Sequence, residues 1–337
     1  MEPSDKQREQ LSTGAIGGAP RDVSSLISIV VPAFDERENL RALYDELCEE
    51  LHAFRWELVI VDDGSTDGTF DAISELARDE RVRGVKLSRN FGHQPALTAG
   101  LREAGGAAVV SMDADLQHPP ALIPEMIREW KRGASIVHTQ RRASEQSWFK
   151  RHTSAWYYRV FSFLSGVSIG EGESDFRLLD REVVDVVVAM EEARPFVRGL
   201  VHWVGYPQAV LPYDVRPRRS GQSHYGLLRM FRLAAAGVTS FSTVPLRIGI
   251  LLGAITGAGA FSELAYVVWI LWRGETVPGW ASVAGLLALM MGANFVLLGF
   301  IGTYIGQIFE RVQGHPAYLI ERRTPTHPAA ESRRREG

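Results

Sequence analysis

The sequence predicts an α/β domain with a mainly parallel sheet, followed by two helices that cross a membrane. Short β-branched runs alternate with helical patterns over residues 27–215, which is typical of βαβ units with parallel strands. Three of the predicted strands end in pairs of acidic residues. Two stretches between residues 245 and 309 are each apolar over more than the ~20 residues that a membrane-spanning helix needs.

The composition excludes several classes of protein. The chain of 337 residues has a net charge of −3, whereas a nucleic-acid-binding domain usually carries a basic excess. Its one cysteine, Cys48, excludes an intramolecular disulfide and a metal site built from cysteines, and we expect it to be a small core residue. Residues 1–26 are rich in Gly, Ser and charged residues and predict a disordered tail without a secretory signal.

The first strands and helices of the α/β domain follow from local patterns. Residues 27–31 form a β-branched run that ends before Pro32, as expected of a buried parallel strand. Residues 38–51 carry leucines at helical spacing. Residues 58–61 predict the second strand, and residues 67–76 predict the second helix.

The alternation continues with a third strand over residues 84–87, a helix over 95–104 and a fourth strand over 107–112. In sheets of this kind, ligands bind beyond the carboxyl ends of the strands. The acidic residues that follow the first, second and fourth strands should therefore converge at one edge. They are Asp35 and Glu36, Asp62 and Asp63, and Asp113 and Asp115.

The two apolar stretches, residues 245–272 and 280–309, predict a membrane hairpin with a short connection. Six arginines lie before or at the start of the first stretch, six follow the second, and the connection carries only Arg273. The positive-inside rule then places the α/β domain and both termini in the cytoplasm, in a multi-pass protein of the inner (plasma) membrane. Two buried helices of a soluble protein are the alternative.

Two further segments mix aromatic and basic residues. Residues 147–165 and 224–244 predict amphipathic helices at the level of the lipid headgroups, and ordinary core helices are the alternative. The predicted organisation is a globular domain over 27–223, a juxtamembrane helix, the two spans, and a cytoplasmic tail over 310–337.

The most informative string is SMDADLQHPP, at residues 111–120. Two carboxylates one residue apart at the end of a strand can hold a hard divalent cation, Mg²⁺ or Mn²⁺, with positions left open for diphosphate oxygens. The metal would offset the charge that develops on a departing nucleoside diphosphate. An acidic pair alone is weak evidence, because such pairs also occur in exposed turns. Here the pair follows an apolar strand and lies beside the other acidic strand ends, which makes the evidence for a metal site strong.

Two other strings surround a predicted nucleotide pocket. In DDGSTDGT, at residues 62–69, a carboxylate can accept the N–H donors of a base ring. Ser65 or Thr66 can also cap the following helix, which is a purely structural role. In PAFDE, at residues 32–36, an aromatic side chain and an acid lie beside the same pocket.

These three strings resemble those of the family 2 glycosyltransferases, which have the GT-A (Rossmann-like) fold. Downstream segments resemble the polyprenyl-phosphate branch, which includes dolichol-phosphate mannose synthase and the bactoprenol glucosyltransferases. The segments are LSRNFG at 87–92, SDFRLLDR at 174–181, RRSGQSHY at 218–225 and SFSTVPLR at 240–247. The resemblance covers residues 27 to 320 approximately, and its motifs occur in the order of the family.

The resemblance implies roles for individual residues. Those that would bind the nucleotide-sugar are Pro32, Ala33, Phe34, Glu36, Asp63, Asp113, Ala114 and Gln117. Those that would hold the metal are Asp113, Asp115 and Gln117. Those that would meet the lipid phosphate are Arg141, Lys150, Ser154, Arg177, Arg218 and Ser223; arginine suits this task because its planar fork pairs with two phosphate oxygens at once. Those assigned to catalysis are Asp115, Asp175 and Arg177.

The sequence departs from the family pattern at two positions. Asp35 stands where the family often has Asn, and His224 stands where the branch often has Lys. The first change adds negative charge near a diphosphate. The second removes a fixed positive charge, because histidine is largely neutral at pH 7.

The acceptor implied by the resemblance determines the expected mechanism. A phosphate monoester, with a second pKa of about 6, is already ionised and can attack the anomeric carbon without a strong general base. The resemblance implies inversion at that carbon. Asp175 is the best candidate for an auxiliary carboxylate, and a structural salt bridge to Arg177 is the alternative.

The expected function is hexose transfer from a nucleotide-sugar to polyprenyl (undecaprenyl) phosphate, with UDP-glucose as the first choice. GDP-mannose and a UDP-amino-sugar remain alternative donors. A processive polysaccharide synthase normally carries the motif QxxRW, which is absent from the sequence. An inactive membrane scaffold would tolerate loss of the acids and arginines of the site, yet all are present.

Glycines in the spans predict close helix contacts. The second span has a seven-residue repeat of glycine from Gly285 to Gly306, and the first has a four-residue repeat from Gly249 to Gly257. Glycine costs about 1 kcal/mol in a helix relative to alanine, but it lets backbones approach closely. We expect a tight hairpin within a homo-oligomer, with a tetramer favoured by the resemblance, and with Glu263 and Asn294 facing protein rather than lipid. The alternative is that glycine is simply common in membrane helices.

Overall fold

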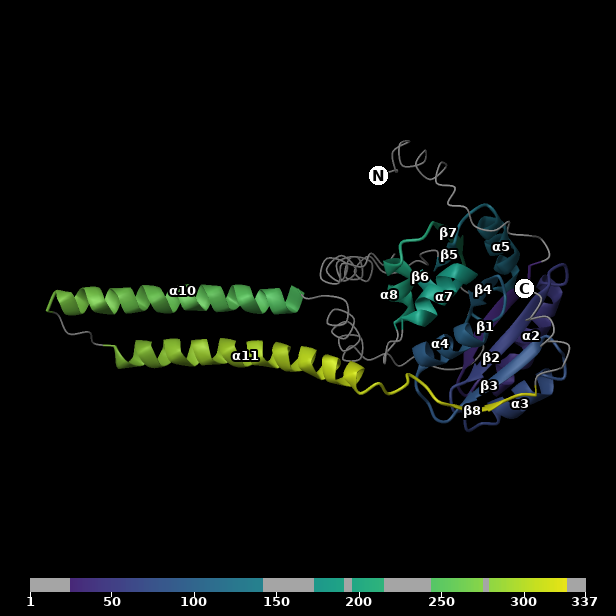
Figure 1. Ribbon diagram of the computed structural model, residues 1–337, viewed down its shortest axis with the longest axis horizontal. Coiled ribbons are helices and arrows are strands. Elements are labelled where there is room, and N and C mark those ends of the chain that lie inside the picture. Colours follow the sequence, from purple (N-terminus) through teal and green to yellow (C-terminus); the bar gives the residue numbers. More distant parts are fainter. Residues whose placement is uncertain (1–24, 142–172, 191–195, 215–243, 275–278, 326–337) are drawn as a thin grey trace. The chain divides into compact units, whose positions relative to one another are not determined.

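A computed structural model describes residues 25–141, 173–190, 196–214, 244–274 and 279–325 of the chain (Figure 1). The chain divides into two compact units, one built around a sheet and one around two long helices. The predicted disordered tail and both predicted amphipathic helices lie almost entirely outside the described residues.

Unit 1, which comprises residues 1–151, 169–222 and 316–337, contains an eight-stranded sheet with the order β7-β5-β6-β4-β1-β2-β3-β8. The strands are β1 (Ile27–Ala33), β2 (Trp56–Asp62), β3 (Val82–Leu87), β4 (Ala108–Ser111), β5 (Ile136–Arg141), β6 (Glu173–Asp180), β7 (Gln208–Tyr213) and β8 (Ile320–Arg323). The four neighbouring strands β4, β1, β2 and β3 are parallel to one another, and β5 is parallel to β7. β6 and β8 run antiparallel to their neighbours. The predicted mainly parallel sheet is confirmed.

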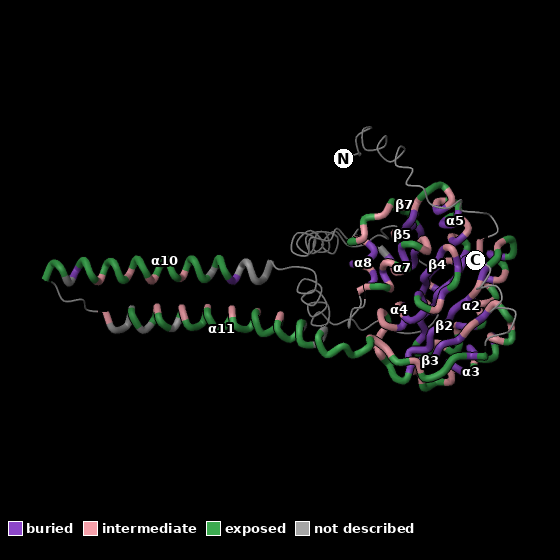
Figure 2. Tube along the Cα trace, in the orientation of Figure 1, coloured by how far each residue is buried: buried purple, intermediate pink, exposed green. Residues whose placement is uncertain are grey.

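Helices cover both faces of this sheet. They are α2 (Arg37–Glu50), α3 (Thr69–Leu76), α4 (His93–Glu103), α5 (Ile123–Lys131), α7 (Arg181–Ala189) and α8 (Val197–Trp203), with a 3₁₀ turn, η1, at Pro120–Leu122. Ile29 and Val31 of β1 share a core cluster with Leu43 of α2. The residue between them, Val30, faces α4, because a Cβ on Gly100 would lie 2.3 Å from it. Alternate side chains of a buried strand thus pack into cores on the two faces of the sheet, and the central strands β1, β2 and β4 are almost entirely buried (Figure 2).

The four predicted strands and the three predicted helices of this unit are confirmed, and each of their ends lies within two residues of its predicted position. β5, β6 and β7 were not among the predicted strands, and neither was β8. It has only four residues, with the sequence IERR, and three of them are exposed. Such a strand lacks the apolar run or alternation by which strands are identified. The predicted C-terminal tail therefore contains an edge strand of the sheet.

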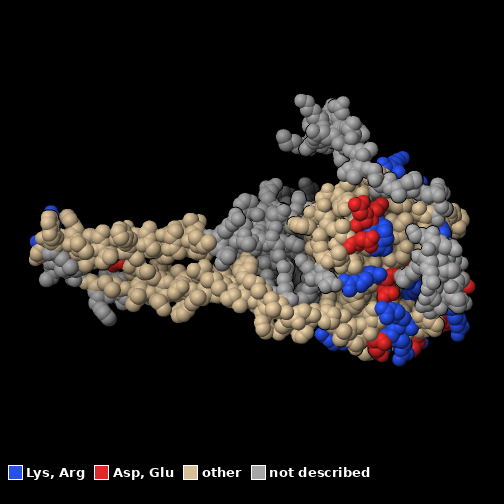
Figure 3. Space-filling view, viewed as in Figure 1, with Lys and Arg blue, Asp and Glu red and all other residues tan. Residues whose placement is uncertain are grey.

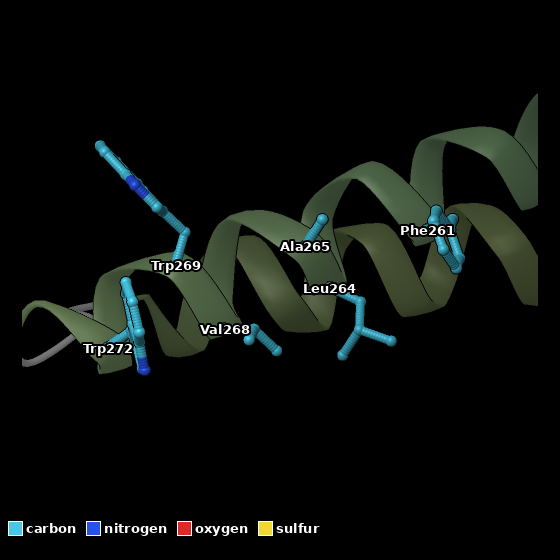
Figure 4. Close-up of a pocket in the computed structure, with 6 residues that line it drawn as sticks. All are labelled: Phe261, Leu264, Ala265, Val268, Trp269 and Trp272. Carbon is cyan, nitrogen blue, oxygen red and sulfur yellow. The ribbon is translucent and has the colours of Figure 1, made fainter.

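Unit 2 contains α10 (Val244–Trp272) and α11 (Trp280–Val312). Both are long and apolar enough to cross a membrane, with mean hydropathies of 1.5 and 2.0 over residues 249–270 and 285–306. Charged side chains are scarce along the visible face of both helices (Figure 3). Trp269 and Trp272 are exposed near the end of α10 (Figure 4), which suits the polar boundary of a bilayer. The two predicted helices are confirmed as helices.

Only part of the predicted glycine packing occurs within one chain. A Cβ on Gly249 would lie 2.4 Å from Leu297, so α10 and α11 approach closely there. A Cβ on any of the other glycines described in these helices would have no atom within 4 Å. These glycines therefore do not hold the hairpin of a single chain together.

Candidate active site

Three loops meet at the carboxyl edge of the parallel strands. The pairing of Ala33 with Asp62 places the ends of β1 and β2 side by side. The Asp35 N–H donates to Ser65 Oγ at 2.9 Å, and the Thr66 N–H donates to Asp35 Oδ1 at 3.1 Å. Asp35 holds this position with a φ of 54°, in the left-handed region that aspartate tolerates better than most residues.

The alternative role of Ser65 or Thr66 as a cap of the second helix is wrong. Gly68, with a φ of 89°, is the N-cap of α3, and the side chain that accepts the N–H of Thr69, the first helical residue, is that of Asp67. Ser65 instead accepts the bond from Asp35 and so links the two loops. Phe34 is 46% exposed, so its ring is accessible to a ligand. The backbone N–H of Glu36 donates to Thr69 Oγ1.

Asp63 connects the end of β2 with the loop between β3 and α4. Its Oδ1 and Oδ2 accept the N–H groups of Phe91 and Gly92, both at 2.8 Å. Burial raises the pKa of Asp63, and these two hydrogen bonds work against that rise. Each carboxylate oxygen keeps a second lone pair, but Asp63 is only 3% exposed. Its recognition of the base stays a prediction.

The DAD string forms a loop that folds back on itself after β4. The Asp113 N–H donates to His118 Nδ1 and the Gln117 N–H donates to Asp115 Oδ1, both at 3.1 Å. Between them, Leu116 has a φ of 61°. The Asp113 side chain is 34% exposed. Among the described residues, no three His, Cys, Asp or Glu side chains are grouped to hold a metal.

His118 lies under this loop and is fully buried. Because a backbone N–H can only donate, the bond from Asp113 requires an unprotonated Nδ1. The proton is then on Nε2, which donates to Ser174 Oγ at 2.7 Å. The ring stacks on Phe176, with centroids 5.0 Å apart. Burial lowers the pKa of His118, which is consistent with a neutral ring that fixes the loop.

Replacing His118 with Phe should test this role. The substitution keeps a ring to stack on Phe176, but it removes the acceptor of the Asp113 N–H and the donor to Ser174 Oγ, which then keeps only the Phe176 N–H as a partner; each lost hydrogen bond costs about 1 kcal/mol. We expect a lower melting temperature and lower turnover at saturating Mn²⁺, while His52→Phe, at an exposed position, should change neither. Wild-type turnover in His118→Phe would show that the ring nitrogens do not position the loop.

A second cluster centres on Asp175 of β6. Its Oδ1 accepts from Arg177 Nη2 at 2.6 Å, and its Oδ2 lies 3.0 Å from Arg198 Nη2 and 3.6 Å from His93 Nε2. Gln94 Nε2 donates to the same oxygen, while its Oε1 accepts the Val197 N–H and so joins α4 to α8. The predicted salt bridge between Asp175 and Arg177 is therefore present.

The opposite charges in this cluster stabilise the ionised forms of one another. Burial alone would raise the pKa of Asp175, but His93, Arg177 and Arg198 hold it well below its usual range. Burial alone would lower the pKa of His93, but the carboxylates of Asp175 and Asp113 raise it overall. His93 Nε2 lies 3.7 Å from Asp113 Oδ1, so it connects the two acidic groups of the site.

The two arginines of the cluster differ in exposure. The side chain of Arg177 is 1% exposed and also donates to the Ser174 carbonyl, whereas that of Arg198 is 28% exposed. Arg198 is thus the more accessible guanidinium of the two. Arg141, at the end of β5, donates to the Tyr213 hydroxyl at 3.3 Å. The other residues predicted to meet the lipid phosphate lie outside the described residues: Lys150, Ser154, Arg218 and Ser223.

Sequence reasoning missed four residues of this site. His93 directly follows the string LSRNFG, and His118 lies within the string SMDADLQHPP. Their positions in or beside these strings could have identified them. Gln94 follows His93. Arg198 belongs to none of the strings, and only the fold brings α8 to Asp175.

The fold and this edge define a class of enzyme. A parallel α/β sheet with an Asp-x-Asp pair after one central strand and an acid after another is the arrangement of a GT-A glycosyltransferase. Comparison with known proteins agrees: residues 28–187 match the family model described as "Glycosyl transferase family 2". The chain belongs to glycosyl transferase family 2.

Relatives with similar sequences extend over most of the chain. An uncharacterized glycosyltransferase of Bacillus subtilis is 38% identical over 88% of this chain and 93% of that protein. A prophage-derived bactoprenol glucosyl transferase of Shigella flexneri is 36% identical over 88% of this chain and 97% of its own length. Among solved structures, glucosyl-3-phosphoglycerate synthase of Mycobacterium tuberculosis with Mn²⁺, uridine diphosphate and phosphoglyceric acid is 21% identical, with a TM-score of 0.46 over 65% of this chain and 79% of that one.

Proposed function

We propose that the chain transfers glucose from UDP-glucose to undecaprenyl phosphate, with inversion at the anomeric carbon. The observation that carries the proposal is the similarity to the bactoprenol glucosyl transferase of Shigella flexneri. It extends over 97% of that protein and 88% of this chain, a span too long to be confined to the sheet of unit 1.

The proposed acceptor needs little help from a base. Its phosphate, with a second pKa of about 6, is mostly ionised at neutral pH and attacks the anomeric carbon through one of its oxygens. The enzyme must then align two anionic substrates and screen their repulsion. We assign the alignment of the lipid phosphate to Arg198, oriented by Asp175, together with Arg141, Lys150, Ser154, Arg218 and Ser223. Arg177 would act through Asp175, because its own side chain is covered.

The site suits a hard divalent cation. Carboxylate and amide oxygens are ligands that Mg²⁺ and Mn²⁺ accept, and Asp113, Asp115 and Gln117 supply them. The contacts of the Asp113 carboxylate with His93 and His118 are long, at 3.7 Å, so this group can take a new partner. When bound, the metal would offset the negative charge that develops on the departing diphosphate.

The remaining assignments follow the same proposal. Pro32, Ala33, Phe34, Glu36, Asp63 and Ala114 would line the donor nucleotide and its sugar. α10 and α11 would span the inner membrane, with unit 1 and both termini in the cytoplasm, where the positive-inside rule puts the flanking arginines.

A donor screen tests the choice of sugar and base. Purified protein in detergent, with undecaprenyl phosphate and Mn²⁺, would be offered UDP-glucose, GDP-mannose and UDP-N-acetylglucosamine in parallel, with undecaprenol, which lacks the phosphate, as the acceptor control. We expect transfer from UDP-glucose at least about tenfold faster than from the others, since matched polar contacts discriminate strongly. Faster transfer from either other donor would overturn the assignment of glucose.

We also propose that the glycines of α11 lie between copies in a homo-oligomer, with a tetramer favoured. Because a Cβ on Gly292 or Gly299 meets no atom of its own chain within 4 Å, the double change Gly292→Leu/Gly299→Leu should leave the single-chain hairpin intact. We expect it to reduce the oligomer size in detergent, measured by light scattering. Gly249→Leu is the contrast, because it collides with Leu297 within the chain. An unchanged oligomer in the double variant would refute this interface.

A further inference from the structure

The chain leaves the sheet at one edge and returns to it at the other. β7 and β8 are the two outer strands, and the sequence between them includes both apolar helices. β8 lies beside β3 in unit 1 (Figure 1), with Val85 opposite Arg323. The segment that follows α11 is therefore part of the sheet that forms the candidate active site.

Polar contacts hold this segment on two elements of the sheet unit. The Ser88 N–H donates to the Leu319 carbonyl at 2.9 Å, just after β3 ends. The Arg323 guanidinium contacts Glu103 Oε1, at the end of α4, at 2.7 and 3.2 Å. β3 and α4 are the two elements that flank the loop over residues 88–92.

Thr324 makes the most buried of these contacts. It is 7% exposed, its N–H donates to the Gly84 carbonyl, and its Oγ1 accepts the Gly84 N–H, both at 2.9 Å. A Cβ on Gly84 would lie 2.8 Å from the methyl group of Thr324 and 2.4 Å from Ile73. The lack of a side chain at Gly84 is therefore what lets Thr324 approach the backbone of β3.

The loop that β3 leads into contacts the proposed nucleotide pocket. Its last two N–H groups, from Phe91 and Gly92, donate to the carboxylate of Asp63. Its backbone also packs on Gly64, where a Cβ would lie 2.4 Å from the carbonyl carbon of Arg89. The position of Asp63 and the position of this loop are thus coupled.

We propose that the segment over residues 319–324 positions the loop over residues 88–92, and through it Asp63, for binding of the donor nucleotide. Thr324 is a positioning residue in this scheme. It contacts no substrate, but its bonds with Gly84 hold β8 on β3, and β8 directly follows Leu319, whose carbonyl accepts the N–H of Ser88 at the start of the loop. The link to the donor rests on the proposed function. The link to the loop rests only on contacts within the chain.

Hydrogen exchange tests the link to the loop without any substrate. In the full-length protein in detergent, Thr324→Val keeps the shape of the side chain but removes the acceptor of the Gly84 N–H. We expect the Phe91 and Gly92 amides to exchange at least about tenfold faster, as in a local opening, while amides of β5, near the other edge, keep their wild-type rates. Thr324→Ser should restore protection, and Thr303→Val in α11 should have no effect.

Binding and kinetics test the link to the donor. With UDP and Mn²⁺ as the calorimetric probe, Thr324→Val should bind about tenfold more weakly than wild type, which matches the loss of one or two hydrogen bonds. The KM for UDP-glucose should rise in proportion, with kcat and the KM for undecaprenyl phosphate unchanged. A merely structural role would lower kcat with the folded fraction and leave the donor KM alone.

The possible failures are distinguishable. Unchanged exchange at Phe91 and Gly92 in Thr324→Val, or equal acceleration across the whole sheet, would overturn the positioning role. Faster exchange at the loop with unchanged UDP affinity would overturn its coupling to the donor. Absence of UDP binding by the wild-type protein would count against the proposed donor, and the exchange result would still decide the role of Thr324.

Discussion

Replacing Asp115 with Asn is expected to lower turnover at least about 100-fold, which is the usual cost of removing a group that stabilises developing charge. The fold should survive, because the amide oxygen of Asn can still accept the Gln117 N–H that now bonds to Asp115. Asp113→Asn should behave in the same way, since the bond from Asp113 to His118 uses the backbone N–H. The measurement is initial rate against Mn²⁺ concentration, with melting temperature recorded alongside.

Asp71→Asn is the matched control for these two variants. Asp71 lies in the first turn of α3 and is exposed, so it should keep wild-type turnover. Full activity of Asp115→Asn in excess EDTA would contradict the assignment of these carboxylates to a metal.

The second large effect is expected on stability. Arg177→Ala leaves Asp175 with one strong cation fewer in a nearly dry environment, and breaking a buried ion pair typically costs about 3–5 kcal/mol. We expect denaturant unfolding of unit 1 to shift by an amount in this range. Arg198→Ala keeps the Arg177–Asp175 pair, and its side chain is more exposed, so it should cost much less stability.

The same two arginines should differ in the opposite way in activity: Arg198→Ala, which costs less stability, should impair use of the lipid substrate. Among molecules that remain folded, Arg198→Ala should raise the KM for undecaprenyl phosphate while the affinity for UDP stays the same, because Arg198 offers the reachable guanidinium. Equal losses of lipid and nucleotide affinity in Arg198→Ala would contradict its assignment to the lipid phosphate. A fully stable Arg177→Ala would contradict the buried ion pair.

Local patterns were sufficient to predict the centre of the sheet. β1, β2 and β4 are apolar runs between turn residues, and a parallel arrangement brings their acidic ends to one edge. Patterns of this kind report burial, so they identified strands that are buried on both faces. They did not reveal β8, whose residues Glu321 to Arg323 are exposed and whose pairing with β3 spans more than two hundred residues of sequence.

Local patterns also predicted part of the candidate site, namely the acidic residues at the ends of the buried strands. Strand ends place Asp63 and Asp113 at the edge, but the sequence does not say what each carboxylate binds. Asp63 accepts two N–H groups from the loop after β3, and Asp175 gathers groups from α4, β6 and α8. Contacts between elements distant in sequence depend on tertiary packing, and no local spacing encodes them.

The identity of the acceptor is the most direct test of the account as a whole. Purified protein would be incubated with UDP-glucose, Mn²⁺ and undecaprenyl phosphate, and the lipid fraction analysed by mass spectrometry and by NMR of the anomeric centre. The account predicts a lipid heavier by one hexose, joined through a phosphodiester with inverted anomeric configuration, and no such product with Asp115→Asn. Release of free glucose without a glycosylated lipid phosphate, or a product with retained configuration, would contradict it.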